Sequence, residues 1–418
     1  MLDKFTIDKL EQEPYFDKNS IWASPLNYHE WCGQPLTRSV YVHDVTLRDG
    51  EQAPGVCFTL PERLRIAEAL SDLGVKRIEA GMPTVSEQVA ESMTRLARMN
   101  LSAEIVAFAR AHSDDIEASL RCGVKAIVIE HTVNPYLCKY AYGLSDQQLL
   151  DRLVGAVLRA KDEGLHTTFM GWDFFRSPLE FTKHVYQTVV REAQPDAIVL
   201  VDTFGVATPI TVYQVVREFK AMFPGVNLEF HCHNEFGWAT GAAISAIAAG
   251  ADGVHSAVNG LGERTGNLST EEIAAALHIL FGVECGVHID KLADVCRLVS
   301  EISRVPIAPN KPVIGSRVFQ VESGVVVDVY SKMGHVGVKP AMTPYLPEIV
   351  GSDPMSFVIG KGSGNSTVKH FLGKHGLALP EADIEHLLAM VKAKAYEKKG
   401  LVTEEEFLAL VGELTGRK

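Results

Sequence analysis

The sequence predicts an α/β fold, a (β/α)8 TIM barrel, followed by a smaller and mostly helical C-terminal region. Short β-branched runs alternate with helical stretches of period near 3.6 from residue 40 onward. There are eight such runs, and eight strands over about 250 residues match a parallel barrel in count and length. The expected strands cover residues 40–47, 76–80, 103–109, 126–130, 166–171, 197–201, 227–231 and 251–256.

An open, doubly wound sheet is the alternative fold. A sheet of that kind that bound a dinucleotide would carry a Gly-x-Gly-x-x-Gly turn after its first strand, and this chain has none there. The helix after the first strand is expected to open at Thr59, because Glu62 follows at the spacing of a capping box.

The remaining chain lies on both sides of the expected barrel domain, residues 39–283. Residues 1–38 are expected to form an irregular arm, since prolines and aromatic residues replace the periodic pattern there. Residues 284–418 are expected to form a C-terminal subdomain. Its helices are predicted over 289–302, 366–375, 381–394 and 403–414, with an extended stretch over 342–351.

The composition is that of an ordinary globular protein, with 418 residues of which 46% are hydrophobic and 22% charged. A formal net charge of −12 argues against nucleic acid or an anionic membrane as a partner. The chain contains no apolar run of about 18 residues, so no membrane-spanning helix is predicted. The N-terminus lacks the pattern of a signal peptide. Seven scattered cysteines without a Cys-x-x-Cys motif favour a reduced, cytoplasmic setting.

The seventh expected strand ends in a His-x-His motif. His231 and His233 would share one face of the strand, and two adjacent imidazoles suit a divalent metal. Two ordinary hydrogen-bonded histidines are the alternative. Asp49, after the first strand, would complete a set of two histidines and one carboxylate with open positions for a substrate. Asn267, in the glycine-rich loop after the eighth strand, could add an oxygen ligand, although that loop could also be a flexible lead into a helix.

Other polar residues at strand ends point to a bound substrate. Arg48 places a positive charge beside the predicted metal, where it could hold a carbonyl oxygen and stabilise an oxyanion, or it could form a surface ion pair. Glu79, flanked by apolar residues, is expected to pair with Arg48. Thr203 can donate to the carboxylate of a small acid or cap the next helix. Ionisable groups gathered at strand ends favour a ligand among them, and the others are Arg110, Glu130, His131, Asp173 and Asp202.

Five ordered motifs between about residue 40 and residue 365 resemble one known family. They are Leu47-Arg48-Asp49-Gly50-Glu51-Gln52, Ile78-Glu79-Ala80-Gly81, Asp202-Thr203, His231-Cys232-His233-Asn234 and Gly260-Leu261-Gly262-Glu263-Arg264-Thr265-Gly266-Asn267. The chain resembles the 2-isopropylmalate synthase and homocitrate synthase family, metal-dependent barrel enzymes that make or break carbon–carbon bonds. The motifs Pro309-Asn310-Lys311-Pro312, Glu322-Ser323-Gly324 and Gly360-Lys361-Gly362-Ser363-Gly364 carry the resemblance past the barrel.

The resemblance implies an acyltransferase that condenses acetyl-CoA with a 2-oxo acid, the acyl group becoming alkyl on transfer. It implies a divalent metal (Zn, Mn or Mg) on Asp49, His231 and His233, with Asn267 near it. Arg48 would then polarise the ketone, and Thr203 would bind the carboxylate of the 2-oxo acid. Arg110, at the end of the third strand, is a further expected substrate-binding residue. The expected partners are the two small-molecule substrates and a second copy of the chain in a homodimer.

Two positions depart from the family pattern. Trp172 precedes Asp173 where the family has a glutamate, and Val326 stands where the family has a histidine after Glu-Ser-Gly-Ile. An indole and an isopropyl group cannot exchange protons at neutral pH. Proton removal must therefore come from elsewhere, differ in nature or be absent, and the candidates are His131, Asp173 and His335. Trp172 could instead offer an aromatic wall to an unusual substrate.

Two other functions compete with the synthase. A lyase or aldolase of the same superfamily would use the same metal and Arg48. Hydroxymethylglutaryl-CoA lyases carry a cysteine in the loop after strand eight, where this chain has Glu263 and Arg264, which favours the synthase. The third hypothesis is a binding or regulatory protein that has lost turnover, and the two departures keep it open.

Overall fold

The structure is a computed structural model that describes residues 4–13, 15–28, 36 and 39–416. The chain divides into two compact units, residues 28–307 and residues 1–27 with 308–418. The expected end of the barrel domain at residue 283 lies inside the first unit. Helix α11 (Leu292–Ser303) follows that residue and still packs against α2 (Leu60–Leu73) of the barrel.

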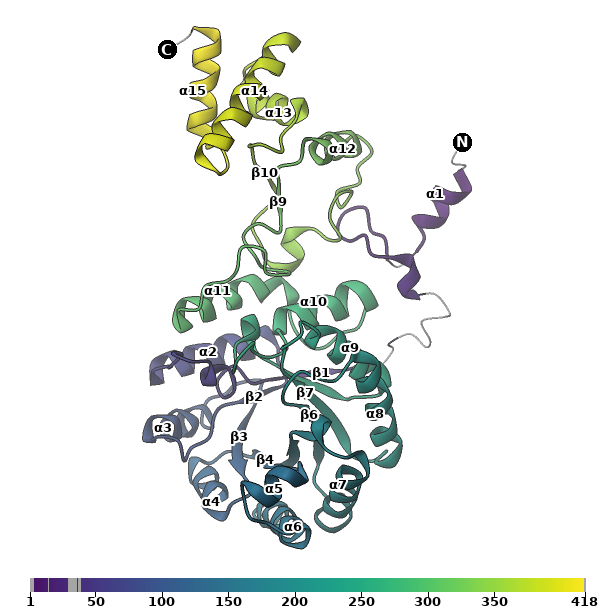
Figure 1. The fold of residues 1–418 in the computed structure, drawn as a ribbon, viewed down its shortest axis with the longest axis vertical. Helices are drawn as coiled ribbons and strands as arrows, with labels where there is room; N and C mark the ends of the chain where they lie inside the picture. Colours follow the sequence, from purple (N-terminus) through teal and green to yellow (C-terminus); the bar gives the residue numbers. More distant parts are fainter. Residues whose placement is uncertain (1–3, 14, 29–35, 37–38, 417–418) are drawn as a thin grey trace. The chain divides into compact units, whose positions relative to one another are not determined.

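The first unit is a closed barrel of eight parallel strands in chain order, as predicted (Figure 1). β1 pairs with both β2 and β8, which closes the sheet and excludes the open, doubly wound alternative. Each strand overlaps its expected range. The bounds are β1 Tyr41–Asp44, β2 Arg77–Glu79, β3 Glu104–Arg110, β4 Ala126–Thr132, β5 His166–Trp172, β6 Ala197–Asp202, β7 Asn227–Cys232 and β8 Gly253–Ser256.

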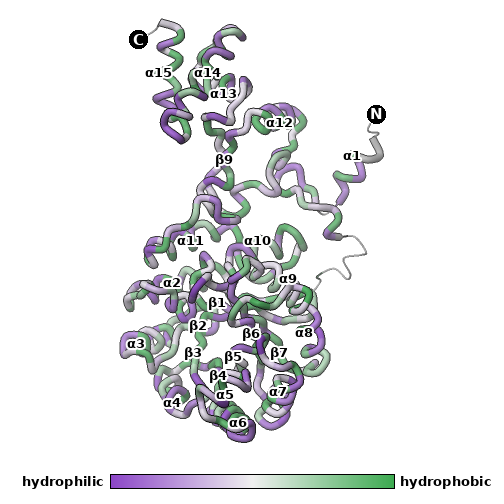
Figure 2. Tube along the Cα trace, viewed as in Figure 1, coloured by the Kyte–Doolittle hydropathy of each residue, from purple (hydrophilic) through white to green (hydrophobic). Residues whose placement is uncertain are grey.

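Helices surround the barrel, and hydrophilic and hydrophobic segments alternate along them (Figure 2), as expected when one side of a helix faces the sheet. Besides α2 and α11 they are α3 Glu87–Leu96, α4 Ser113–Cys122, α5 Pro135–Tyr140, α6 Asp146–Asp162, α7 Leu179–Ala193, α8 Pro209–Met222, α9 Ala239–Ala249 and α10 Thr270–Phe281. Short 3-10 helices cover Gly50–Gln52, Phe174–Arg176, Val258–Gly260 and Ile289–Lys291. The predicted capping box of α2 is present: Thr59 N donates to Glu62 Oε2 at 2.7 Å.

The second unit is mostly helical, as predicted for the C-terminal region. Its elements are α1 Lys4–Leu10, a 3-10 turn Pro25–Tyr28 that reaches the first unit, α12 Gly324–Gly334, α13 Asn365–Lys374, α14 Glu381–Lys398 and α15 Glu404–Thr415, with a two-stranded sheet of β9 Gln320–Val321 and β10 Ser356–Phe357. Val368, Leu387 and Phe407 lie in the core that joins α13, α14 and α15. The extended stretch expected over 342–351 is wrong for most of its length. Residues 342–344 form a turn and a bend, and a 3-10 helix spans Pro347–Val350, where proline favours a first helical position. Only Tyr345 and Leu346 are extended.

The N-terminal arm packs against a later segment of its own unit. Trp22 N donates to Pro344 O at 2.8 Å, and Leu346 N donates to Ser20 O at 2.9 Å. Residues 29–35, 37 and 38 of the expected arm lie outside the described residues. Among the described residues, no helix is both long and apolar enough to cross a membrane.

Candidate active site

A cavity of about 230 Å³ opens at the carboxyl ends of the barrel strands. In parallel barrels, catalytic groups gather at this end of the sheet. The residues after β1, at the ends of β4, β5 and β7, and after β6 all contribute to its wall. The lining residues are Arg48, Asp49, Gln52, Phe108, Glu130, Tyr142, Met170, Trp172, Val201, Thr203, His231, His233 and Glu263.

Asp49, His231 and His233 converge on one side of this cavity. Their ligand atoms lie within 4.8 Å of one another, and all three side chains are buried. Asp49 Oδ2 lies 3.5 Å from His231 Nε2, and Asp49 Oδ1 lies 3.4 Å from His233 Nε2. The three residues expected to form a metal set are therefore brought together from β1 and β7.

The hydrogen bonds of His233 favour a cation between it and Asp49. His233 Nδ1 lies 2.7 Å from the Thr203 carbonyl oxygen, which can only accept, so Nδ1 carries the proton. In the neutral ring, the lone pair of Nε2 then faces a carboxylate oxygen. A proton or a metal cation between these two atoms removes their repulsion, and a backbone carbonyl on the other ring nitrogen is a usual support of a ligating histidine.

The charges in this set match the ligand forms that a metal requires. Burial holds the pKa of His231 well below its usual range, so its imidazole is neutral. Burial alone would raise the pKa of Asp49, but the Arg48 guanidinium beside it holds that pKa well below its ordinary value. A carboxylate and two neutral imidazoles are the forms that bind metal.

Asn267 lies beside the same set and holds Asp49. Its Nδ2 atom donates to Asp49 Oδ1 at 2.9 Å and to the Leu261 carbonyl at 2.8 Å, while its buried Oδ1 has no hydrogen-bond partner among the described residues. Gly262 permits this close approach, because a Cβ atom there would lie 2.2 Å from Asn267 Nδ2. The glycine-rich loop therefore packs backbone directly against the candidate ligands.

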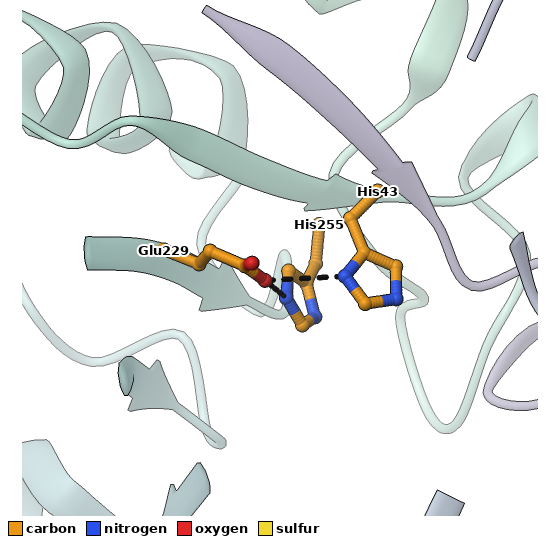
Figure 3. Close-up of side chains that lie close together, drawn as sticks. All are labelled: His43, Glu229 and His255. Carbon is orange, nitrogen blue, oxygen red and sulfur yellow. Dashed lines mark hydrogen bonds and ion pairs between the residues drawn. The ribbon is translucent and has the colours of Figure 1, made fainter. Parts of the chain in front are cut away.

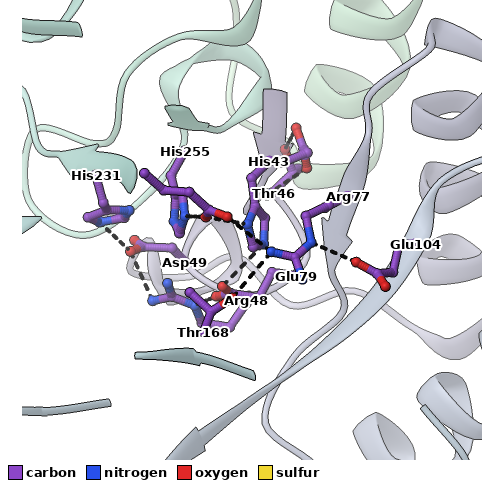
Figure 4. A network of polar contacts seen from close by, with 12 residues as sticks. His43, Thr46, Arg48, Asp49, Arg77, Glu79, Glu104, Thr168, His231 and His255 are labelled. Atoms are coloured by element: carbon purple, nitrogen blue, oxygen red, sulfur yellow. Dashed lines mark hydrogen bonds and ion pairs between the residues drawn. The ribbon is translucent and has the colours of Figure 1, made fainter. Parts of the chain in front are cut away.

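Arg48 is held on two sides and leaves one nitrogen free. Its Nε donates to Glu79, as predicted, and its Nη1 donates to Asp49 Oδ2 at 3.0 Å (Figure 4). The guanidinium also lies over the Phe108 ring, 4.2 Å from its centroid. The buried Nη2 has no partner among the described residues. The pair with Asp49 is buried, which excludes the surface alternative, and Nη2 can donate to an oxygen in the cavity.

Thr203 and Trp172 line the cavity from β6 and β5. Thr203 Oγ1 accepts from Asp173 N at 2.9 Å, so its hydroxyl hydrogen stays available for a ligand. The alternative, that Thr203 caps the next helix, is wrong, because Thr208 caps α8 through Thr211 N.

The other expected site residues lie away from this cavity. Asp173 binds Arg176 Nε at 2.7 Å and accepts from Asn134 Nδ2 at 2.8 Å, and it does not line the cavity. His131 and Arg110 line a neighbouring cavity of about 450 Å³. His335 follows α12 in the other unit. None of these positions tests their expected roles, which stay predictions.

Glu130 is the site residue that sequence reasoning left without a role. It lines both cavities, and no hydrogen bond or ion pair of its carboxyl group is present within the described part of the chain. The signal that would have found it is the period of two along β4. Ala126 and Val128 belong to the apolar cluster inside the barrel, so Glu130 also points inward.

A second cluster, His43, Glu229 and His255, lies inside the barrel and was also missed (Figure 3). Glu229 Oε2 lies 2.6 Å from His255 Nε2 and 3.1 Å from His43 Nδ1. Its other oxygen accepts from Tyr41 at 2.7 Å and Arg77 at 3.0 Å. Burial alone would raise the pKa of Glu229, but these donors hold it well below its ordinary value. Protein donors therefore satisfy this carboxylate without a metal.

Comparisons with known proteins place these residues in a family context. The model of the HMGL-like family matches residues 39–299. The chain is 36% identical to homocitrate synthase AksA of Methanocaldococcus jannaschii, over 91% of this chain and 92% of that protein. It is 34% identical to the 2-isopropylmalate synthase of the same organism, over 90% of this chain and 72% of that protein. It is 35% identical to its (R)-citramalate synthase CimA, over 90% and 75%.

Among solved structures, the chain is similar to the HMG-CoA lyase of Bacillus subtilis. The TM-score is 0.60 at 20% sequence identity, over 66% of this chain and 97% of the lyase. This structural similarity confirms the barrel fold.

Proposed function

This chain belongs to the HMGL-like family, and on that basis we propose that it is an acyltransferase that condenses acetyl-CoA with a 2-oxo acid. The acyl group becomes an alkyl group in the product, and hydrolysis of the thioester releases CoA. One observation carries the proposal. Asp49, His231 and His233 surround one point of a cavity into which Arg48 also presents an unpaired nitrogen.

Asp49, His231 and His233 would hold a divalent metal, Zn, Mn or Mg, with Asn267 beside them. The fit is supported by the 3.4 Å approach of His233 Nε2 to Asp49 Oδ1 and by the unpartnered Asn267 Oδ1. When bound, the metal supplies Lewis acidity to the oxygens of a 2-oxo acid.

The side chains around the cavity orient the ketone. Arg48 Nη2 donates to the ketone oxygen, where negative charge develops as the new carbon–carbon bond forms. Glu79 fixes the guanidinium, so this donor needs no rearrangement during the reaction. Thr203 donates its hydroxyl hydrogen to the carboxylate of the acid, and Trp172 forms an aromatic wall.

A lyase with the same residues is the second function to test. The loop after β8 carries Glu263 and Arg264 and no cysteine. Arg264 is engaged there, since its Nη2 donates to the Thr203 carbonyl at 2.6 Å. The loop thus serves to hold the cavity wall and offers no thiol for cleavage.

Release of free CoA thiol tests the proposal. Purified protein with a divalent metal and acetyl-CoA is expected to release thiol with at least one member of a panel of 2-oxo acids that vary in size and charge. The same protein stripped of metal by a chelator is the control. Absence of thiol release with the whole panel, together with retro-aldol products from hydroxyacyl-CoA substrates, would replace the synthase with a lyase.

The setting and assembly of the protein are part of the same proposal. A reducing cytoplasmic setting is supported by the six cysteines of the described chain, all of which are free. The expected homodimer is tested by light scattering coupled to size-exclusion chromatography, which reports a mass near twice 45.7 kDa if it is correct.

A further inference from the structure

The proposed condensation needs a base, and this chain lacks both the histidine that would serve acid–base work by resemblance and the glutamate that would support the site. A thioester methyl group must lose a proton before its carbon can attack the ketone. Trp172 and Val326 cannot accept that proton. Asp173, the nearest carboxylate in sequence to Trp172, is bound by Arg176 and Asn134 outside the cavity lining.

Glu130 is placed where such a base is needed. It follows Ala126 and Val128 along the inner face of β4 and lies beyond the apolar cluster that fills the barrel. In the sheet it pairs with Arg110 of β3 and Met170 of β5. Its carboxyl group therefore lies just beyond the apolar side chains of the barrel interior, at the cavity. Glu130 lines this cavity together with Arg48, Asp49, His231 and His233.

The Glu130 carboxyl also differs from the other acids around the cavity. Asp49 and Glu79 both bind Arg48, and Glu263 binds Arg264 at 3.1 Å. No hydrogen bond or ion pair of the Glu130 carboxyl group occurs in the ranges that the structure describes. A partly buried carboxylate without a partner destabilises the folded protein. A structural role therefore does not account for a glutamate at residue 130.

We propose that Glu130 is the catalytic base of the condensation, an inference that rests on the proposed synthase function. Its carboxylate takes one proton from the methyl group of the acetyl thioester. The electron pair of that C–H bond becomes the enolate and then the bond to the ketone carbon. The π pair of the ketone moves to its oxygen, opposite Arg48 Nη2. The resulting alkoxide takes the proton back from Glu130, and water then hydrolyses the thioester.

The charges that face Glu130 suit this role. Although part of the side chain is exposed to the cavity, burial raises the pKa of Glu130 to about 7, and Glu79 and Asp49 act in the same direction. Arg48 and Arg110 oppose that shift. The other titratable groups around the two cavities it lines are Asp114, Asp115, His112, His131, Tyr142, Arg152, His231, His233 and Glu263. A base works best when its pKa lies near the working pH.

Three variants test the inference in the metal-loaded, full-length protein. Glu130→Gln is expected to lower kcat at least about 100-fold, the usual contribution of general base catalysis, while metal content and 2-oxo acid affinity stay within twofold. Glu130→Asp, which keeps a carboxylate one methylene shorter, should keep the fold, the metal and the acid limb of the pH profile with a reduced kcat. Glu163→Gln, which removes one acid from the end of α6 far from the cavity, is the matched control.

Exchange of methyl deuterium gives a readout that a purely structural role would not change in the same way. Wild-type protein with a 2-oxo acid analogue should wash deuterium out of trideuteroacetyl-CoA, and Glu130→Gln should not. A Gln variant that turns over within threefold of wild type, or that loses metal, overturns the inference and leaves the synthase function standing. Wild-type protein that releases no thiol with any 2-oxo acid removes the proposed function, and this inference with it.

Discussion

His233 Nε2 lies 3.4 Å from Asp49 Oδ1, while the opposite nitrogen of the same ring donates to the Thr203 carbonyl. The ring is thus held by the residue that follows β6, and its Nε2 atom faces a carboxylate from the loop after β1. This arrangement is stable when a cation separates the two atoms, and it leads to the first prediction.

His233→Ala is expected to abolish both metal content and turnover, because it removes one of three converging ligands and leaves Asp49 with one imidazole. Metal is measured by inductively coupled plasma mass spectrometry and turnover by thiol release. His278→Ala, at a partly exposed histidine of α10, is the control and should change neither. Full metal retention in the His233 variant would exclude this residue from the ligand set.

Arg48→Lys is expected to lower kcat/KM by about 100-fold or more, the range seen when one oxyanion donor is lost. A lysine keeps the charge but cannot bind Glu79 and a ketone oxygen through separate, fixed nitrogens. Steady-state kinetics measure the effect. A variant that differs from wild type only in KM would show that Arg48 binds the ground state alone.

Arg48→Leu should destabilise the protein by about 3–5 kcal/mol, since Glu79 would be buried without its partner. The double variant Arg48→Leu/Glu79→Leu should recover much of that loss, because it removes the buried charge as well. Urea unfolding of the metal-free proteins measures both. Equal stability of the single and double variants would contradict a mutual role for this pair.

Gly262→Ala is expected to weaken metal binding by about 10- to 100-fold, the usual effect of disturbing groups that support ligands. A Cβ atom at this position would overlap Asn267 Nδ2 and approach Asp49 Oδ1 to 3.0 Å. Gly225→Ala is the matched control, since no atom lies within 4 Å of a Cβ atom there. Competition with a chelator of known affinity measures the change in metal affinity. Unchanged metal affinity would show that the loop shifts to accommodate the methyl group without disturbing Asn267 or Asp49.

The raised pKa of Glu130 predicts how stability depends on pH. A carboxyl with a raised pKa in the folded state holds a proton that the unfolded chain has already lost, so its contribution to stability is lost as pH rises through about 7. Metal-free wild type should therefore lose stability relative to Glu130→Gln between pH 5 and pH 8. Urea midpoints measure this, with Glu163→Gln expected to track wild type at every pH. Parallel curves for wild type and Glu130→Gln would show an ordinary, solvated carboxyl.

The strands were predictable because alternation and short β-branched runs are local signals. The convergence of Asp49, His231 and His233 was predictable because these residues lie at or just after strand ends. The roles of Glu130 and His131 were harder to separate. The sequence predicts that the fourth strand ends at residue 130, but β4 continues to Thr132. Since neighbours on a strand face opposite ways, Glu130 points inward and His131 does not.

Other features depend on contacts between distant strands. The cluster of His43, Glu229 and His255 joins β1, β7 and β8, and no single stretch of sequence carries its pattern. The engagement of Asp173 by Asn134 across two barrel loops is equally invisible in the sequence. Hydrogen bonds and ion pairs between residues of different strands decide which carboxyl groups stay unpaired. These contacts exist only once the sheet has closed.

The two ion pairs of Arg48, with Asp49 and with Glu79, affect the entropy of ligand binding. Asp49 after β1 and Glu79 at the end of β2 fix the guanidinium plane before any ligand arrives, and the Phe108 ring lies against it. The entropy of ordering a long, flexible side chain is therefore spent during folding and not at each encounter. Arg48 therefore binds the ketone without rearranging. The other residues that line the cavity then determine which substrates the protein prefers.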